Sequence, residues 1–253
     1  MAQGLKKALA RNKRDNSLEG KTLALIFEKS SLRTRVSFEV AMSQLGGNSI
    51  YLSRHDMDLG QREAVKDVAH TLSRYVHAVA LRTFAQGVVE EMARNSTVPI
   101  INALSDAYHP CQALTDLFTI REKLGKLEGL TLSFIGDANN VARSLACLSA
   151  GFGIYFRIAS PAGYQLSPAF VEGLERQARG VAKVAPDKAI YLTDDPREAA
   201  RGADVLYTDT WVSMGQEQEA EVRHKVFRDY QVNNSLLQLA KEGALVMHCL
   251  PAH

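Results

Sequence analysis

Residues 22–39 read TLALIFEKSSLRTRVSFE. The first six predict a buried strand, and the apolar residues after Arg35 recur at helical spacing up to Gly46, so a strand turns into a helix between Ser31 and Arg35. The start of a helix presents unpaired backbone N–H groups and the positive end of the helix dipole. Hydroxyl and arginine side chains add to that end, so this turn suits a phosphate group. On this stretch alone, a capped helix with solvated arginines is the alternative interpretation.

Strand and helix patterns alternate along the whole chain, which is typical of α/β proteins with mostly parallel sheets. The expected strands are residues 22–27, 48–52, 78–81, 98–102, 130–135, 154–159, 189–192, 205–208 and 244–247. After the helix that begins near Arg35, the expected helices are residues 62–75, 86–95, 113–124, 139–150, 168–179, 196–201 and 233–241. A long polar loop is expected after residue 208. A charged joint between Gly125 and Gly129 predicts two doubly wound domains, residues 1–125 and 126–253, each a mostly parallel sheet flanked by helices.

The composition is that of an ordinary globular protein, with 46% hydrophobic and 23% charged residues among 253. A net charge of +2 predicts no nucleic-acid partner, and no apolar run is long enough to predict a membrane span. The three cysteines, an odd number without metal-ligand spacing, predict free thiols in the cytoplasm. Residues 1–14 are basic and free of acids, which fits a transit peptide or a short amphipathic helix; the helix is favoured because it runs almost directly into the first strand.

Polar clusters follow the expected strands at their carboxyl ends, where open α/β sheets bind ligands. These clusters are residues 31–35, 82–83, 109–112, 137–140, 209–215 and 248–253. Each has an ordinary structural explanation when taken alone: a histidine before proline is typical of a turn, and Cys249 near a strand end is typical of packing. Six clusters at one kind of position together predict a binding site.

Three common site motifs do not account for these clusters. Residues 136–140 read GDANN in a strand–turn–helix context, but the second and third glycines of a dinucleotide fingerprint are missing, which argues against NAD. The sequence also has no Gly-Lys-Ser/Thr P-loop and no Gly-x-Ser-x-Gly nucleophile elbow.

Four of the clusters match one known family. They are FEKSSLRTR at residues 27–35, HPCQ at 109–112, DTWVSMG at 209–215 and HCLP at 248–251. Over nearly its whole length the chain resembles the aspartate/ornithine carbamoyltransferase superfamily, and within it most closely the ornithine carbamoyltransferases. The first motif is shared by the superfamily, whereas the SMG and HCLP loops point to ornithine; aspartate enzymes usually carry threonine in place of Cys111 and lack the SMG loop.

The resemblance implies transfer of the carbamoyl group from carbamoyl phosphate to the side-chain amine of L-ornithine, giving L-citrulline and phosphate in arginine biosynthesis. It also implies an active site in the interdomain cleft, no metal or other cofactor, and a homotrimer. Two alternatives stay open: a non-catalytic chain that binds carbamoyl phosphate or assembles with full-length subunits, and a transferase for another amine such as N-acetylornithine or putrescine.

Site residues follow from the same resemblance. Those implied for carbamoyl phosphate are Ser31, Leu32, Arg33, Thr34, Arg82, His109 and Gln112. Those implied for ornithine are Asn140, Asp209, Ser213, Met214, Cys249 and Leu250. Arg82 and His109 would act on the carbamoyl oxygen, and Cys249 would handle the amine, either as a base or only by positioning it.

The chain departs from the family pattern in three ways. Leu32 replaces a common threonine, and His77 stands where an aspartate is frequent, which we interpret as structural. Family members also begin earlier and continue past residue 253 into an arginine-bearing loop and a final helix. We therefore expect a chain truncated at both ends, with exposed apolar surface and a looser hinge between its domains.

Overall fold

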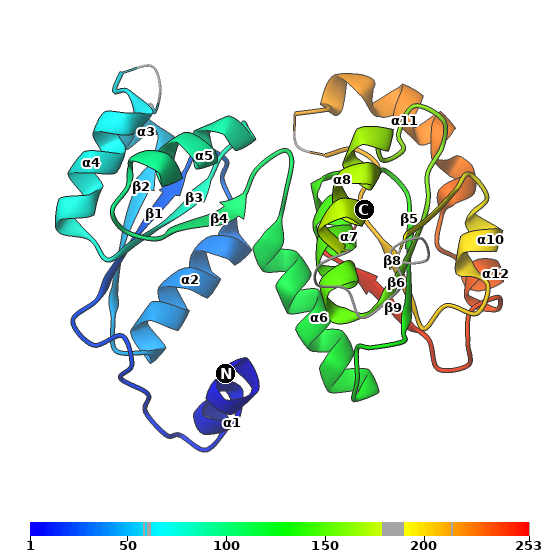
Figure 1. Cartoon of the computed structure of the whole chain (residues 1–253), viewed down its shortest axis with the longest axis horizontal. Helices are drawn as coiled ribbons and strands as arrows, with labels where there is room; N and C mark the ends of the chain where they lie inside the picture. The colour runs from blue at the N-terminus through cyan, green and yellow to red at the C-terminus, as the bar shows by residue number, and fades with distance from the viewer. Residues whose placement is uncertain (58, 60–61, 179–189, 214, 253) are drawn as a thin grey trace. The chain divides into compact units, whose positions relative to one another are not determined.

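The computed structural model describes residues 1–57, 59, 62–178, 190–213 and 215–252 (Figure 1). The chain divides into two compact units, Met1–Ala107 and Tyr108–His253, called here the first and second units. Each unit contains one parallel sheet flanked by helices. The predicted α/β architecture of two doubly wound parts is confirmed.

The first unit has a four-stranded sheet in the order β2-β1-β3-β4, and all of its strand pairs are parallel. Its elements are α1 (Ala2–Ala10), β1 (Thr22–Phe27), α2 (Leu32–Gln44), β2 (Asn48–Ser53), α3 (Arg54–Met57), α4 (Val65–Tyr75), β3 (Ala78–Arg82), α5 (Gln86–Asn95) and β4 (Ile100–Leu104). The inner strands β1 and β3 are buried almost throughout, as their continuous apolar runs predict. Because β1 and β3 are neighbours, the turn after Phe27 lies beside the end of β3.

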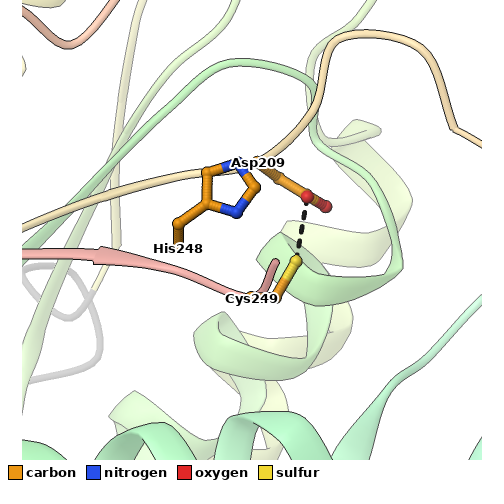
Figure 2. Close-up of side chains that lie close together, drawn as sticks. All are labelled: Asp209, His248 and Cys249. Carbon is orange, nitrogen blue, oxygen red and sulfur yellow. Dashed lines mark hydrogen bonds between the residues drawn. The ribbon is translucent and has the colours of Figure 1, made fainter. Parts of the chain in front are cut away.

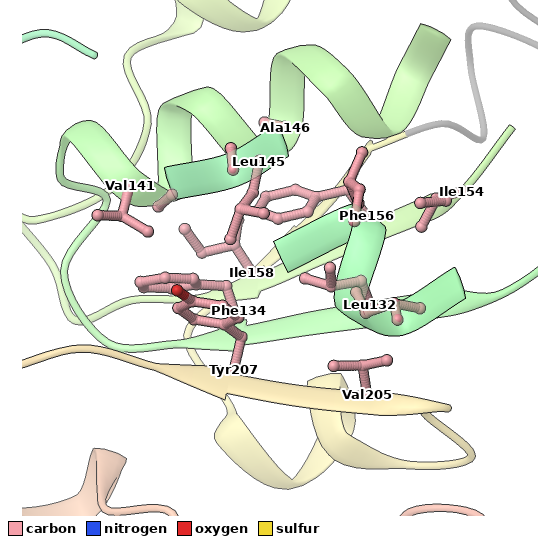
Figure 3. Packing of buried hydrophobic residues seen from close by; sticks show 14 of the residues in the cluster. Leu132, Phe134, Val141, Leu145, Ala146, Ile154, Phe156, Ile158, Val205 and Tyr207 are labelled. Carbon is pink, nitrogen blue, oxygen red and sulfur yellow. The ribbon is translucent and has the colours of Figure 1, made fainter. Parts of the chain in front are cut away.

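The second unit has a five-stranded parallel sheet in the order β7-β6-β5-β8-β9. Its elements are α6 (Pro110–Leu124), β5 (Thr131–Ile135), α7 (Asn140–Phe152), β6 (Tyr155–Ala159), α8 (Pro168–Ala178), β7 (Ile190–Thr193), α10 (Pro196–Ala200), β8 (Val205–Thr208), α11 (Ala220–Val226), α12 (Asn234–Leu237), β9 (Leu245–His248) and the short 3₁₀ helices η1 (Glu217–Glu219) and η2 (Arg228–Tyr230). Its main core packs α6, α7 and α8 against the sheet, with the rings of Phe134 and Tyr207 stacked 5.6 Å apart at the centre (Figure 3).

Helix α6 belongs to the second unit by its contacts. Its residues Ala113, Leu117 and Ile120 are buried in the same core as Phe134 and Tyr207. The compact units therefore divide before α6, whereas the sequence places a glycine-bracketed joint after it. The domain division at residue 125 stays a prediction.

The expected polar loop after residue 208 is wrong for residues 220–226, which form α11. Polar residues dominate this segment, and its one buried residue is Arg223. The helix expected over residues 233–241 ends at Leu237, because the Leu239 carbonyl and the Lys241 N–H instead bond to residues 202 and 203. The last residue of the helix expected at 168–179 and the first of the strand expected at 189–192 lie outside the described residues.

The apolar spacing after Arg35 predicts helix α2 but not the face that it buries. Only Met42 of that helix is buried, while Leu32, Val36 and Val40 remain exposed at 77%, 46% and 45%. Among the described residues, no helix is both long enough and apolar enough to cross a bilayer.

Candidate active site

The turn at Ser31 has the geometry of a helix start. Ser31 is the N-cap of α2, and its hydroxyl oxygen accepts a hydrogen bond from the Thr34 N–H at 3.4 Å while its O–H donates to the Thr34 hydroxyl at 3.0 Å. The Arg35 side chain already has partners within the first unit, because it donates to Glu39 at 2.9 Å and stacks on the Tyr51 ring. The exposed Arg33 and the first N–H groups of α2 are therefore the groups of this turn that suit an anion.

Two side chains that the sequence does not single out hold the start of this turn in place. Glu28 accepts a hydrogen bond from the Thr83 hydroxyl. Lys29 is buried, pairs with Asp106 and lies over the Phe84 ring at 4.3 Å. Both ties run from the end of β1 to residues near the ends of β3 and β4, so the phosphate-suited turn is fixed to the sheet edge.

Arg82 ends β3 beside this turn. It is the register partner of Phe27, and its carbonyl accepts the Glu28 N–H at 2.9 Å. Its side chain is buried, and its Nε has no hydrogen-bond partner among the described residues. Burial lowers the pKa of Arg82, although a guanidinium stays charged at any physiological pH. A buried cation with an unpaired N–H is the arrangement expected of a group that awaits an anion.

The start of α6 carries His109 and Gln112 in the second unit. His109 is the N-cap, and its N–H donates to the Ser144 hydroxyl at 2.7 Å, which fixes the start of α6 against α7. The Gln112 amide donates to Asp116 at 3.0 Å, one helical turn later. The other Asp116 oxygen accepts the Tyr207 hydroxyl at 2.9 Å. Burial raises the pKa of Asp116 to about 6 despite these two hydrogen bonds, so the carboxyl is ionised at pH 8.

Asp209, Asn139 and Cys249 meet at the carboxyl edge of the second sheet. They follow the ends of β8, β5 and β9, and because β8 lies between the other two strands, their side chains converge. One Asp209 oxygen accepts the Asn139 amide at 2.7 Å, and the other accepts the Cys249 thiol at 2.9 Å (Figure 2). Asn139 also caps α7 through its amide oxygen, so the orientation of its amide is fixed.

The Cys249 thiol is a hydrogen-bond donor and not a thiolate. Burial, and then the neighbouring Asp209 carboxylate, raise the pKa of Cys249 well above its ordinary value. His248, from the end of β9, completes the group (Figure 2). Asp209, His248 and Cys249 offer one oxygen, nitrogen or sulfur atom each within 4.8 Å of one another, a set that could hold a metal ion.

Arg223 of α11 joins the turn after β5 to the loop after β8, which carries Asp209 and Ser213. It pairs with Asp137 in the turn after β5, and it donates to the Trp211 carbonyl in the loop after β8. Its guanidinium also lies 4.8 Å from the Tyr164 ring. The Arg223 side chain is 3% exposed, so the pair with Asp137 is a buried one.

The predicted site residues fall into three groups. Ser31, Leu32, Arg33, Thr34 and Arg82 lie together at one edge of the first unit; His109 and Gln112 lie at the start of α6; Asp209, Cys249 and Leu250 lie at the carboxyl edge of the second sheet. The Ser213 N–H donates to Gln216 at 3.1 Å, and Met214 lies outside the described residues.

Asn139 is the neighbour of Asp209 that sequence reasoning missed, since the resemblance implied Asn140 at this place. Its signal was present, because an asparagine directly before a helix is a common N-cap and the turn follows a buried strand. His77, interpreted as structural, accepts the Thr22 N–H at 3.1 Å and so joins the starts of β3 and β1.

Together these features define a class: an α/β enzyme whose charged side chains gather at the carboxyl edges of two parallel sheets. A model of the aspartate/ornithine carbamoyltransferase carbamoyl-P binding domain matches residues 1–122, and a model of the Asp/Orn binding domain matches residues 128–253. The chain belongs to the aspartate/ornithine carbamoyltransferase family.

Individual relatives match the whole chain or nearly all of it. The ornithine carbamoyltransferase of Anoxybacillus flavithermus is 49% identical over 253 residues, which are 100% of this chain and 79% of that protein. That of Methanopyrus kandleri is 53% identical over 234 residues, 92% of this chain and 73% of that protein. The solved structure of ornithine carbamoyltransferase from Pyrococcus furiosus matches with a TM-score of 0.93 at 46% identity, covering 100% of this chain and 79% of that one.

Proposed function

We propose that this chain transfers the carbamoyl group of carbamoyl phosphate to the side-chain amine of L-ornithine, giving L-citrulline and phosphate. Family membership and relatives named ornithine carbamoyltransferase support this reaction over the alternatives of a non-catalytic chain or another acceptor. The observation that carries the proposal is the buried Arg82, whose Nε lacks a partner among the described residues and which ends its strand beside the Ser31 turn.

In the proposed reaction the unprotonated ornithine side-chain nitrogen attacks the carbonyl carbon, and the proton that it loses on forming the C–N bond is taken up by the leaving phosphate. The bond from that carbon to the phosphate oxygen breaks, and its electron pair leaves with phosphate. Negative charge builds on the carbonyl oxygen, where Arg82 and His109 would stabilise it. Ser31, Arg33, Thr34 and the N–H of Leu32 would hold the phosphate, whose charge rises as it leaves. Gln112 would orient the carbamoyl group.

The ornithine half would use the second unit. Asp209, Ser213, Met214 and Asn140 would bind the amino and carboxylate groups, and Cys249 with the Leu250 carbonyl would position the reacting amine. Asn139 joins this set, because it holds one oxygen of Asp209. The reacting amine must lose its proton, and a lysine-like amine has a pKa of about 10.4, so we expect the rate of citrulline formation to rise with pH above neutrality.

Product analysis with a panel of acceptors tests the reaction. The purified chain should form citrulline and phosphate in equal amounts from carbamoyl phosphate and L-ornithine. Its kcat/KM for L-ornithine should exceed that for putrescine or N-acetylornithine by at least ~100-fold. Neither of these acceptors carries both a free α-amino group and a carboxylate, so protein groups that bind them in L-ornithine would be left without partners. Folded protein that binds carbamoyl phosphate and forms no citrulline would instead support the non-catalytic alternative.

Substitutions at Cys249 show whether its thiol positions the reacting amine or acts as a base. Because its thiol donates to Asp209 and its pKa is raised, we expect Cys249→Ser, which keeps a donor, to retain kcat/KM for ornithine within about threefold. Cys249→Ala should lose about tenfold, and Cys147→Ala, outside the site, should change nothing. Equal losses of about 100-fold or more in the serine and alanine variants would mean that the thiolate acts as a base.

We also propose a homotrimer in the cytoplasm. The exposed Leu32, Val36 and Val40 lie four residues apart on α2 and form an apolar stripe that association would cover, which supports self-association. The free state of all three cysteines supports a reducing compartment. Sedimentation equilibrium should give three times the 27.8 kDa chain mass, and a mass of one chain at all concentrations would refute the trimer.

A further inference from the structure

Asp116 is a buried carboxylate that the proposed reaction does not use directly. It is 4% exposed, and its two oxygens accept hydrogen bonds from different elements of the second unit. One takes the Gln112 amide N–H at 3.0 Å, and the other takes the Tyr207 hydroxyl at 2.9 Å. Tyr207 is fully buried and stacked on Phe134, so it cannot turn away from the carboxylate.

We propose that Asp116 is a positioning residue that decides which end of the Gln112 amide faces the carbamoyl group. An ionised carboxylate only accepts hydrogen bonds, so the amide nitrogen of Gln112 must face Asp116 and its amide oxygen must face the other way. That oxygen can accept only from a donor, and the carbamoyl group carries two N–H donors. The inference rests on the proposed function, in which Gln112 binds the carbamoyl group.

The arrangement couples this orientation to the sheet. Tyr207 lies in β8, and Asp209 follows the same strand two residues later. One strand therefore fixes both the acceptor that Gln112 presents and the carboxylate proposed for ornithine. A positional error in β8 would disturb both substrates, whereas a change at Asp116 should act on the carbamoyl group through Gln112 and on Asp209 and Cys249 only through its charge.

Asp116→Asn tests the inference, because it keeps the size of the side chain and adds a donor. The Tyr207 hydroxyl should donate its hydrogen bond to the amide oxygen of the introduced asparagine. The amide nitrogen of that asparagine then faces Gln112. The Gln112 amide must then turn and present N–H groups to the carbamoyl N–H groups. We expect the Kd of carbamoyl phosphate to rise about tenfold, the loss of one strong hydrogen bond.

Inorganic phosphate is the matched probe, since it would contact Ser31, Arg33 and Thr34 and no carbamoyl-binding residue. The inhibition constant of phosphate should change less than about twofold in Asp116→Asn. The ratio of the carbamoyl phosphate Kd to the phosphate inhibition constant should therefore rise. Tyr207→Phe removes a hydrogen bond from the same carboxylate but leaves the Gln112 contact, and should shift the ratio less than about threefold.

A swap of donors completes the test. In the double variant Asp116→Asn with Gln112→Glu, the introduced asparagine amide donates to one oxygen of the introduced carboxylate, while the other oxygen accepts from the carbamoyl group. The ratio should therefore return to within about threefold of the wild-type value. Thermal unfolding of each variant confirms that the fold is retained, and the double variant keeps the test open should the single one unfold.

Equal weakening of both ligands in Asp116→Asn, or no recovery in the double variant, overturns the inference while the wild-type enzyme still forms citrulline. A wild-type protein that binds no carbamoyl phosphate overturns the proposed function, and this inference with it.

Discussion

Replacing Arg82 by methionine is expected to lower kcat/KM for carbamoyl phosphate by about 10³-fold while leaving the protein at least as stable as before. The loss follows from the removal of a fixed cationic donor aimed at a developing negative charge, which costs about 10²–10³ even for a neutral donor. Stability should not fall, because Arg82 is buried, has an unpaired Nε among the described residues, and carries a charge whose desolvation lowers its pKa.

Two further variants make this result specific. Arg94→Met makes the same change at an exposed arginine of the first unit and should alter neither activity nor unfolding temperature. Arg82→Lys keeps the charge but loses the planar fork, so its activity should lie between those of the wild type and Arg82→Met. Initial rates of citrulline formation and thermal unfolding measure both effects. A fully active Arg82→Met protein would show that Arg82 is not part of the site.

Replacing Arg223 by methionine is expected to lower the free energy of unfolding by about 3–5 kcal/mol, the range for breaking a buried ion pair by removing one partner. Asp137 would lose its cation, and the loop after β8 would lose the tie from Arg223 to the Trp211 carbonyl. Because that loop carries Asp209 and Ser213, we also expect a rise in the KM for ornithine with little change in the KM for carbamoyl phosphate.

The pH dependence of this loss has a definite sign. In the folded wild-type protein, burial raises the pKa of Asp137 while Arg223 opposes the shift, and Asp209 and Glu219 add to it. Without Arg223 the pKa rises further, so the folded variant binds a proton that the unfolded chain releases. The variant should therefore be less destabilised at pH 5 than at pH 8.

Arg176→Met is the control for Arg223→Met, since Arg176 and Glu172 form an exposed pair on α8 and contribute little. Denaturant unfolding at both pH values gives the comparison. Equal stability of the Arg223 and Arg176 variants would contradict the assigned role of the buried pair.

The order of strands and helices could be predicted from the sequence because the patterns that indicate each element lie within that element or at its ends. The apolar run that ends at Phe27 and the cap at Ser31 place a strand–turn–helix without knowledge of the rest of the chain. The strand ends that carry Arg82 and Asp209 follow from the same kind of pattern, and each parallel sheet brings the ends of its own strands to one edge.

What the sequence could not predict depends on contacts between distant residues. Nothing in residues 220–226 marks Arg223 as a buried side chain, because its buried ion pair is with Asp137, 86 residues away. Asp116 reads as an ordinary charged position on α6, and only its contact with Tyr207, 91 residues away, shows that it is buried and paired. The face of α2 was also beyond pattern reasoning, since Val36 and Val40 are apolar and yet exposed.

The claim that this chain transfers the carbamoyl group from carbamoyl phosphate to L-ornithine is tested by following the carbonyl carbon. With carbamoyl phosphate labelled with ¹³C at its carbonyl carbon, the NMR signal should move to the ureido carbon of citrulline when wild-type protein and L-ornithine are both present. Arg82→Met should make this transfer about 10³-fold slower. A label that ends only in carbamoyl phosphate and its spontaneous breakdown products, with folded wild-type protein and L-ornithine present, would contradict the claim.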